Sequence, residues 1–259
     1  MNKYNLVKLN TARNCLRYVI RAFSIKKIYI PYYLCPAIRN SILKENCKIV
    51  FYHIDKKFRP VQDFSKDAFI LYPNYFGICS HIVDELSLEY KNLIVDNAHS
   101  FYSEPKGIAS FNSLRKFFPT VLDGAFLYTT KIIDEQFQID ENNYAKKNLS
   151  YREVCENEQR LDFEDIKYIN PISENYIEDK EKRIEKINYW KNKLNSTNML
   201  EVQINANDLP FCYPYLAKDE KTANELVKML EIEPFRYWHN LPDDFEEKIF
   251  YTNLVAISI

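Results

Sequence analysis

Three apolar runs decide the fold, and they read Lys48-Ile-Val-Phe-Tyr-His53, Ala68-Phe-Ile-Leu-Tyr72 and Asn92-Leu-Ile-Val95. Nearly continuous apolar runs of this length are typical of strands that are covered on both faces, as in a parallel sheet. Polar or helical stretches separate the runs, and a short β-rich run that ends in a proline, residues 27–31, precedes them. This alternation predicts an α/β fold with a mainly parallel sheet.

Further elements are expected on both sides of these runs. Residues 11–23 and 37–44 carry apolar side chains at helical spacing, and the first of these helices begins after a polar Asn10-Thr11 start. Later patterns predict strands at residues 108–111, 124–128, 211–216 and 251–257, and helices at residues 172–194 and 221–230. In the helix at residues 172–194, the expected buried stripe consists of Ile177, Ile184, Ile187 and Leu194.

Two domains are expected in the 259 residues. Residues 134–159 are polar and charged and have little apolar periodicity before Tyr151. We therefore predict a large α/β domain at residues 1–150 and a small α+β domain at residues 151–259.

Composition excludes several classes of protein. The 35 Lys and Arg residues against 36 Asp and Glu residues leave a net charge of −1, so there is no overall positive field for nucleic acid or an anionic membrane. No run approaches the ~18 apolar residues of a membrane span, and the N-terminus has no signal core. The six cysteines form no C-x-x-C pair and the four histidines are scattered, which indicates neither a metal site nor a disulfide framework. We expect a soluble cytoplasmic protein with reduced thiols.

The best candidates for chemistry are Asp96 and Lys116. Asp96 ends a predicted strand, and ligands of parallel α/β sheets bind beyond the carboxyl ends of the strands. Lys116 lies among aromatic residues, and apolar surroundings favour the uncharged amine that can attack a carbonyl group. Alternatively, Asp96 is a turn residue, and Lys116 belongs with Arg115 to a basic surface turn.

Four short motifs follow one another over residues 10–130. They are Thr11-Ala-Arg-Asn-Cys-Leu16, Ile28-Tyr-Ile-Pro31, Asp96-Asn-Ala-His99, and Ser113-Leu-Arg-Lys116 followed by Asp123-Gly-Ala125. In this order the chain resembles the DegT-type sugar aminotransferases, which are pyridoxal phosphate enzymes of fold type I. Residues 173–188 are similar to the helix that opens the family's small domain. The resemblance implies a three-layer architecture around the mainly parallel sheet.

The resemblance also implies a site for pyridoxal 5'-phosphate. Lys116 would bind the cofactor covalently and carry a proton between substrate and cofactor, and Asp96 would keep the pyridine nitrogen protonated. These two are the expected catalytic residues. His99 would lie near the phenolic oxygen of the cofactor, and Cys35 stands where the family often has an aromatic residue that stacks on the ring.

The phosphate group of the cofactor would bind at the start of the first helix. The resemblance assigns it to backbone N–H groups of Arg13 and Asn14, together with the hydroxyl of Ser110 or Ser113. The positive end of a helix dipole favours such an anion.

The implied reaction transfers an amino group from an amino acid, with glutamate as the expected donor, to a keto sugar nucleotide in polysaccharide or related sugar biosynthesis. A homodimer is implied as well, and we expect the aromatic loop at residues 74–77 to lie near the dimer contact. Two alternatives remain open, the first because the chain is short for the family and has Cys35 at the stacking position. One is a non-catalytic relative that serves as a binding or scaffold protein. The other is a metal-dependent hydrolase that uses Asp96 and His99.

Overall fold

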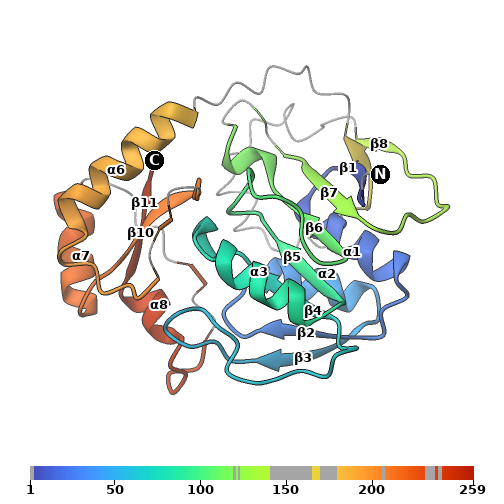
Figure 1. The fold of residues 1–259 in the computed structure, drawn as a ribbon, viewed down its shortest axis with the longest axis horizontal. Helices are drawn as coiled ribbons and strands as arrows, with labels where there is room; N and C mark the ends of the chain where they lie inside the picture. Colours follow the sequence, from blue (N-terminus) through green and yellow to red (C-terminus); the bar gives the residue numbers. More distant parts are fainter. Residues whose placement is uncertain are drawn as a thin grey trace.

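A nine-stranded sheet forms the centre of the molecule in the computed structural model (Figure 1). Its strands follow the order β3-β2-β4-β5-β6-β7-β1-β9-β8. The structure describes residues 3–118, 121, 123–140, 165–169, 180–202, 204–205, 208–230, 237–238 and 241–259. The strands of this sheet are β1 (Asn5–Leu9), β2 (Lys27–Pro31), β3 (Lys48–Tyr52), β4 (Ile70–Pro73), β5 (Leu93–Asp96), β6 (Ala109–Phe111), β7 (Ala125–Thr129), β8 (Ile139–Asp140) and β9 (Tyr168–Ile169).

The strands β3, β2, β4, β5 and β6 run parallel to one another, as the apolar runs predicted. At the carboxyl end of this set, Asp96 is aligned with Pro73 on one side and Phe111 on the other. β7 is antiparallel to β6, and β1 is antiparallel to β7. The parallel core therefore ends at β6, and the short helical turn η2 (Leu114–Lys116) lies between β6 and its antiparallel neighbour in the chain.

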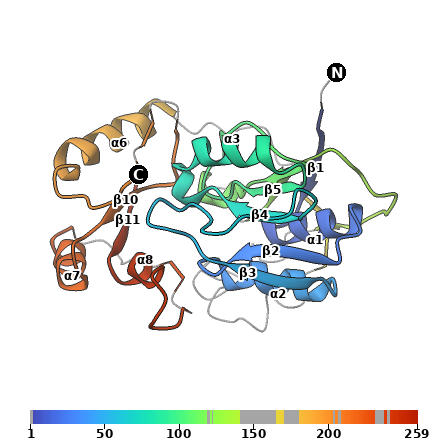
Figure 2. The ribbon, with the colours of Figure 1, turned by 60° about the horizontal axis from the view of Figure 1, so that its bottom comes forward.

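Helices cover both faces of the sheet, which gives the expected three layers (Figure 2). The helices α1 (Ala12–Ala22) and α2 (Pro36–Lys44) pack on one face in a core that includes Leu16 and Ile94. The helix α3 (Ser80–Glu89) packs on the other face, where Ile82 and Val95 share a second core. Because side chains alternate along a strand, the neighbours Ile94 and Val95 serve opposite faces.

The C-terminal part carries a two-stranded antiparallel sheet of β10 (Cys212–Leu216) and β11 (Leu254–Ser258). Three helices accompany it, namely α6 (Lys180–Leu194), α7 (Glu220–Met229) and α8 (Lys248–Thr252). This mixture agrees with the expected α+β character. The proposed boundary at residue 150 and residues 172–179 of the expected helix lie outside the described residues.

The expected stripe on α6 is partly wrong. Ile187 and Leu194 are buried, but Ile184 is 42% exposed, and the buried position next to it belongs to Arg183. The periodic pattern favoured the apolar Ile184, whereas the guanidinium of Arg183 is buried because it finds carbonyl partners. Ile177 lies outside the described residues. The last strand also begins later than predicted, because Tyr251 still belongs to α8.

The expectation for the loop at residues 74–77 is wrong as well. Tyr75 and Phe76 are fully buried in the chain's own core, where Tyr75 stacks on Phe58 with ring centroids 4.9 Å apart. These aromatic side chains therefore have no surface to offer a second subunit. Among the described residues, no helix is long and apolar enough to cross a membrane.

Candidate active site

Asp96 is a buried carboxylate that is fixed from both sides. Its backbone carbonyl accepts a hydrogen bond from the Asn74 N–H at 2.9 Å, and the next residue, Asn97, donates to the Phe111 carbonyl at 2.7 Å. The side-chain oxygen Oδ1 accepts the Ala98 N–H at 2.9 Å. No hydrogen bond to the other oxygen, Oδ2, is found among the described residues. Burial raises the pKa of this carboxyl group, while the charge of Lys116 and the bond from Ala98 act to lower it.

Lys116 ends the turn η2 and lies close enough to Asp96 for the two charges to act on each other. Its Nζ atom lies 5.6 Å from the centre of the Phe211 ring. Burial lowers the pKa of Lys116 to about 8, helped by the charge of Arg115 and opposed by that of Asp96. The structure thus brings the two expected catalytic residues together, and near pH 8 about half of the lysine is an uncharged amine.

His99 is enclosed by aromatic rings. Its imidazole stacks on Phe211 with centroids 5.2 Å apart, on Phe76 at 5.8 Å and on Trp238 at 6.0 Å, and Tyr237 meets it edge-on at 5.4 Å. Burial and the positive charge of Lys116 lower the pKa of His99 well below its usual value. The ring is therefore neutral at physiological pH and cannot supply a positive charge to a ligand.

The start of α1 is built as expected for an N-capped helix, but its groups are already engaged. Thr11 is the N-cap, and its hydroxyl accepts the Asn14 N–H at 3.1 Å. The Asn14 amide donates to Asn10 and to the Asp165 carbonyl, both at 2.9 Å, and accepts from Arg17. A phosphate that used the Asn14 N–H would have to displace the Thr11 hydroxyl. Arg13 lies beside it in the first turn and is partly exposed.

The two candidate serines differ. The Ser110 hydroxyl accepts the Lys106 N–H and donates to the Lys106 carbonyl, both at 2.9 Å, so it closes the turn before β6. Ser113 is buried next to η2, and no hydrogen bond of its hydroxyl is found among the described residues. Of the two, Ser113 is the one whose hydroxyl can turn to a ligand.

Two cysteine thiols also lie near Lys116. Cys35, the N-cap residue of α2, and Cys212, the first residue of β10, both lie close enough to act electrostatically on Lys116. Burial raises the pKa of Cys212 far above its usual value, so this thiol stays protonated. Cys35 is partly buried. Within the described residues, no group of three His, Cys, Asp or Glu side chains could hold a metal ion, so the hydrolase alternative gains no ligand set there.

The C-terminal part completes the site with residues that the sequence did not single out. The Phe211 N–H donates to the carbonyls of Phe76 and His99, both at 3.1 Å. Arg183 donates from Nη1 to the carbonyls of Pro210 at 3.0 Å and Phe211 at 3.3 Å. The one sequence signal that could have indicated Arg183 is a charged residue beside an apolar stripe, a pattern that usually marks a solvated helix face.

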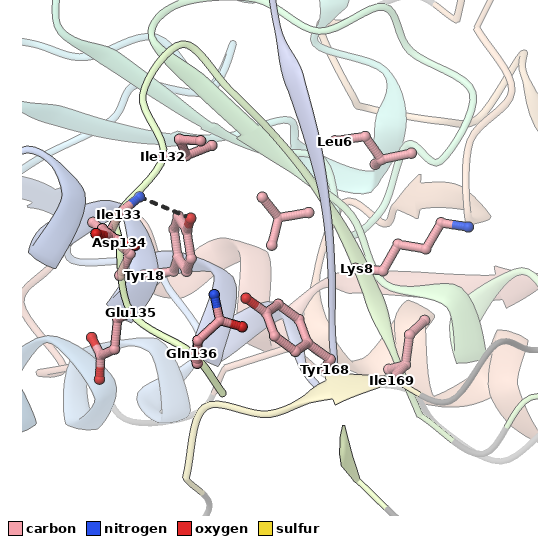
Figure 3. A pocket seen from close by; sticks show the side chains of 11 residues that line it. Leu6, Lys8, Tyr18, Ile132, Ile133, Asp134, Glu135, Gln136, Tyr168 and Ile169 are labelled. Atoms are coloured by element: carbon pink, nitrogen blue, oxygen red, sulfur yellow. Dashed lines mark hydrogen bonds between the residues drawn. The ribbon is translucent and has the colours of Figure 1, made fainter. Parts of the chain in front are cut away.

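A cavity of about 600 Å³ lies elsewhere, between β1, α1 and residues 132–136 (Figure 3). Figure 3 shows Tyr18 and Tyr168 at this cavity, and the Ile133 N–H donates to the Tyr18 hydroxyl at 3.1 Å. None of its lining residues belongs to the predicted site.

No protein-family model and no curated protein sequence matches the chain. Solved structures do. A DegT DnrJ EryC1 StrS aminotransferase from Brucella abortus is 11% identical with a TM-score of 0.60, over 98% of this chain and 80% of that one. The chain has the fold of the sugar aminotransferases.

Two further structures agree with this fold. The putative sugar aminotransferase Spr1654 from Streptococcus pneumoniae, in a form with pyridoxamine phosphate (PMP), is 12% identical with a TM-score of 0.63, over 98% of this chain and 80% of that one. Helicobacter pylori PseC, an aminotransferase of pseudoaminic acid biosynthesis, is 15% identical with a TM-score of 0.60, over 98% of this chain and 81% of that one. At such identities the likeness establishes the fold.

Proposed function

We propose that this protein is a pyridoxal 5'-phosphate-dependent aminotransferase that acts on a keto sugar nucleotide. The observation that carries the proposal is a buried carboxylate, Asp96, near enough to a lysine of lowered pKa, Lys116, for their charges to interact, beyond the carboxyl ends of β5 and β6. Pairs of titratable groups with shifted pKa values are typical of catalytic sites. The fold shared with sugar aminotransferases supports the choice of reaction.

The residues present fit the cofactor. The Asp96 oxygen Oδ2, without a partner among the described residues, suits a protonated ring nitrogen, because a buried carboxylate is costly unless it is paired. The hydroxyl of Ser113 and the first turn of α1 are the groups that would hold the phosphate, with Arg13 in that turn and with the Asn14 N–H once the Thr11 hydroxyl has turned away from it. When bound, pyridoxal phosphate supplies an aldehyde group and an electron-accepting ring.

Side chains of this protein would supply the other chemical roles of the reaction. Lys116 offers an amine that is uncharged in part at neutral pH, so it can act as a nucleophile and then accept or return a proton at Nζ. Asp96 holds negative charge near that amine. The aromatic rings around His99 exclude water from this side of the site, which strengthens the interaction between Asp96 and a positively charged group.

The substrate class rests on the relatives. PseC is an aminotransferase of pseudoaminic acid biosynthesis, and Spr1654 is a putative sugar aminotransferase. On that basis we propose that this chain also acts on a keto sugar nucleotide, with an amino acid such as glutamate as the amino donor. A homodimer is part of the same proposal.

Cofactor binding tests the proposal directly. Pyridoxal phosphate added to the purified protein should give a visible absorbance, and borohydride reduction followed by peptide mapping should place the pyridoxyl mass on Lys116. The Lys116→Arg variant should lose both signals. Lys106→Arg is a matched control, because Lys106 is a partly exposed lysine that pairs with Asp84. A pyridoxyl label on another lysine would reject the assignment of Lys116. If the protein gains no visible absorbance when pyridoxal phosphate is added, a binding or scaffold protein would be favoured instead.

A further inference from the structure

Phe211 connects the C-terminal part to the lysine of the site. Its ring lies 5.6 Å from the Lys116 Nζ atom and stacks on His99 at 5.2 Å. It also lies 6.1 Å from the ring of Phe117, the residue after Lys116. Phe211 therefore forms one wall of the space around the lysine amine, although it directly precedes β10 in the small sheet.

The backbone around Phe211 is held from three directions. Its N–H donates to the Phe76 and His99 carbonyls, which belong to two loops of the large sheet. The carbonyls of Pro210 and Phe211 accept from a single nitrogen of Arg183. The Phe211 ring cannot move away from Lys116 unless some of these bonds break.

Arg183 also contacts the turn that carries the lysine. Its side chain is buried, and its Cζ atom lies 4.9 Å from the centre of the Phe117 ring. One guanidinium thus touches both the segment at residues 210–211 and the residue that follows Lys116. A planar guanidinium can stack on a ring and donate in its plane at the same time, which the compact ammonium of a lysine cannot do.

We propose that Arg183 is a positioning residue for Lys116: it holds the ring of Phe211 against the Lys116 amine, so that helix α6 controls the access of water to that amine. The proposal rests on the proposed function only in that Lys116 is the reactive lysine. It assigns to the C-terminal part a role in the reactivity of a residue in the large sheet.

Two effects of the Phe211 ring oppose each other. An aromatic face attracts an ammonium group, which favours the charged amine. The same ring displaces water, which favours the uncharged amine. Burial is the largest cause of the lowered pKa of Lys116, so the second effect prevails. Withdrawal of the ring should therefore admit water and raise the pKa of Lys116.

The test measures the reactivity of Lys116 in the protein without cofactor. Acetic anhydride is added in trace amounts over a pH series, and mass spectrometry follows the peptide that contains Lys116. The wild-type rate should rise with a midpoint at about pH 8. Arg183→Met should move this midpoint up by one pH unit or more, which slows acetylation at pH 8 by at least about fivefold.

A double-mutant cycle shows whether the ring transmits the effect. Phe211→Ala should slow acetylation as Arg183→Met does, and the double variant should be no slower than either single one, because both changes remove the same wall. Phe211→Leu keeps an apolar side chain and should stay within about twofold of the wild type. Lys186→Met, which removes an exposed charge from the same helix, should leave the rate unchanged.

Two results would overturn the proposal. One is an unchanged midpoint in Arg183→Met or in Phe211→Ala. The other is additive effects in the double variant, which would mean that Arg183 acts through its own charge. If Arg183→Met does not fold, Arg183→Lys takes its place: it keeps the charge and loses the planar contact, so an unchanged midpoint there contradicts the proposal. Because the assay contains no pyridoxal phosphate, its outcome is independent of whether Lys116 binds that cofactor.

Discussion

Asp96 and Lys116 are two residues whose sequence context was informative because their signals are local. Asp96 ends a strand with an unmistakable apolar pattern, and Lys116 stands in a run of aromatic residues. The burial that shifts both pKa values, in contrast, comes from side chains distant in sequence. Phe211 lies over Lys116, and no pattern in the sequence associates these two residues.

Replacement of Asp96 by Asn should reduce turnover by ~10²-fold or more, because an electrostatic group used in the transition state is lost. The fold should be retained, since the side-chain carbonyl of the new asparagine can still accept the Ala98 N–H. Steady-state kinetics with glutamate and a keto sugar nucleotide measure the effect, and circular dichroism checks the fold. Asp84→Asn, an exposed acid on α3, is the control. Full activity in a folded Asp96→Asn protein would show that Asp96 is only a turn residue.

Replacement of Lys116 by Met should stabilise the protein at neutral pH. The folded-state pKa of Lys116 is about 8, below the ~10.4 of a free lysine, so the folded state binds this proton less tightly than the unfolded chain does. This difference destabilises the folded state by its full amount below pH 8, and the destabilisation decreases as the pH rises toward ~10.4. The gain from Lys116→Met should therefore reach up to about 3 kcal/mol near pH 7 and shrink above pH 8.

Urea unfolding at pH 7 and at pH 9.5 measures this difference. Lys106→Met, which removes a partly exposed lysine, should show no comparable dependence on pH. A Lys116→Met protein that is less stable than the wild type at pH 7, or whose gain grows with pH, would contradict the buried-ammonium explanation.

At the scale of elements, the loop after β4 packs tightly between the loop that contains His99 and the segment that contains Pro210. Gly77 has a φ of +81°, and a Cβ atom there would lie 2.3 Å from the His99 carbonyl oxygen and 2.9 Å from Pro210 Cα. Both neighbours are backbone atoms, so neither can move aside cheaply. Because the loop is aromatic, we expected it near a subunit contact. The close approach of three backbone segments instead buries it.

Gly77→Ala should therefore destabilise the protein by about 3 kcal/mol, the sum of a strained backbone and a steric contact. Thermal unfolding measures the loss. Gly124→Ala is the comparison: it also has a positive φ, but its nearest neighbour is the Leu114 side-chain atom Cδ1 at 3.0 Å, which can shift. We expect a smaller loss there, and equal losses would mean that backbone strain alone decides both.

At the scale of the whole molecule, we predict a homodimer. The aromatic residues expected at its contact, Tyr75 and Phe76, are buried, so the prediction rests on the family resemblance. Sedimentation of the protein with and without pyridoxal phosphate should show a dimer at micromolar concentration. A single monomer boundary in both samples would refute the dimer.

The sequence alone indicated the parallel strands β2 to β6 and the helices α1 and α2, because these segments have clear apolar patterns, but it did not indicate β1, β8, β9 or the order of the strands in the sheet. It also determined that Asp96 and Lys116 follow neighbouring strands. The tertiary structure decided what surrounds them. The antiparallel strands β1 and β7, the buried Tyr75 and Phe76, and the contacts of Phe211 and Arg183 all join segments far apart in the chain. A local pattern cannot specify such contacts, because burial and hydrogen-bond partners exist only once the chain has packed.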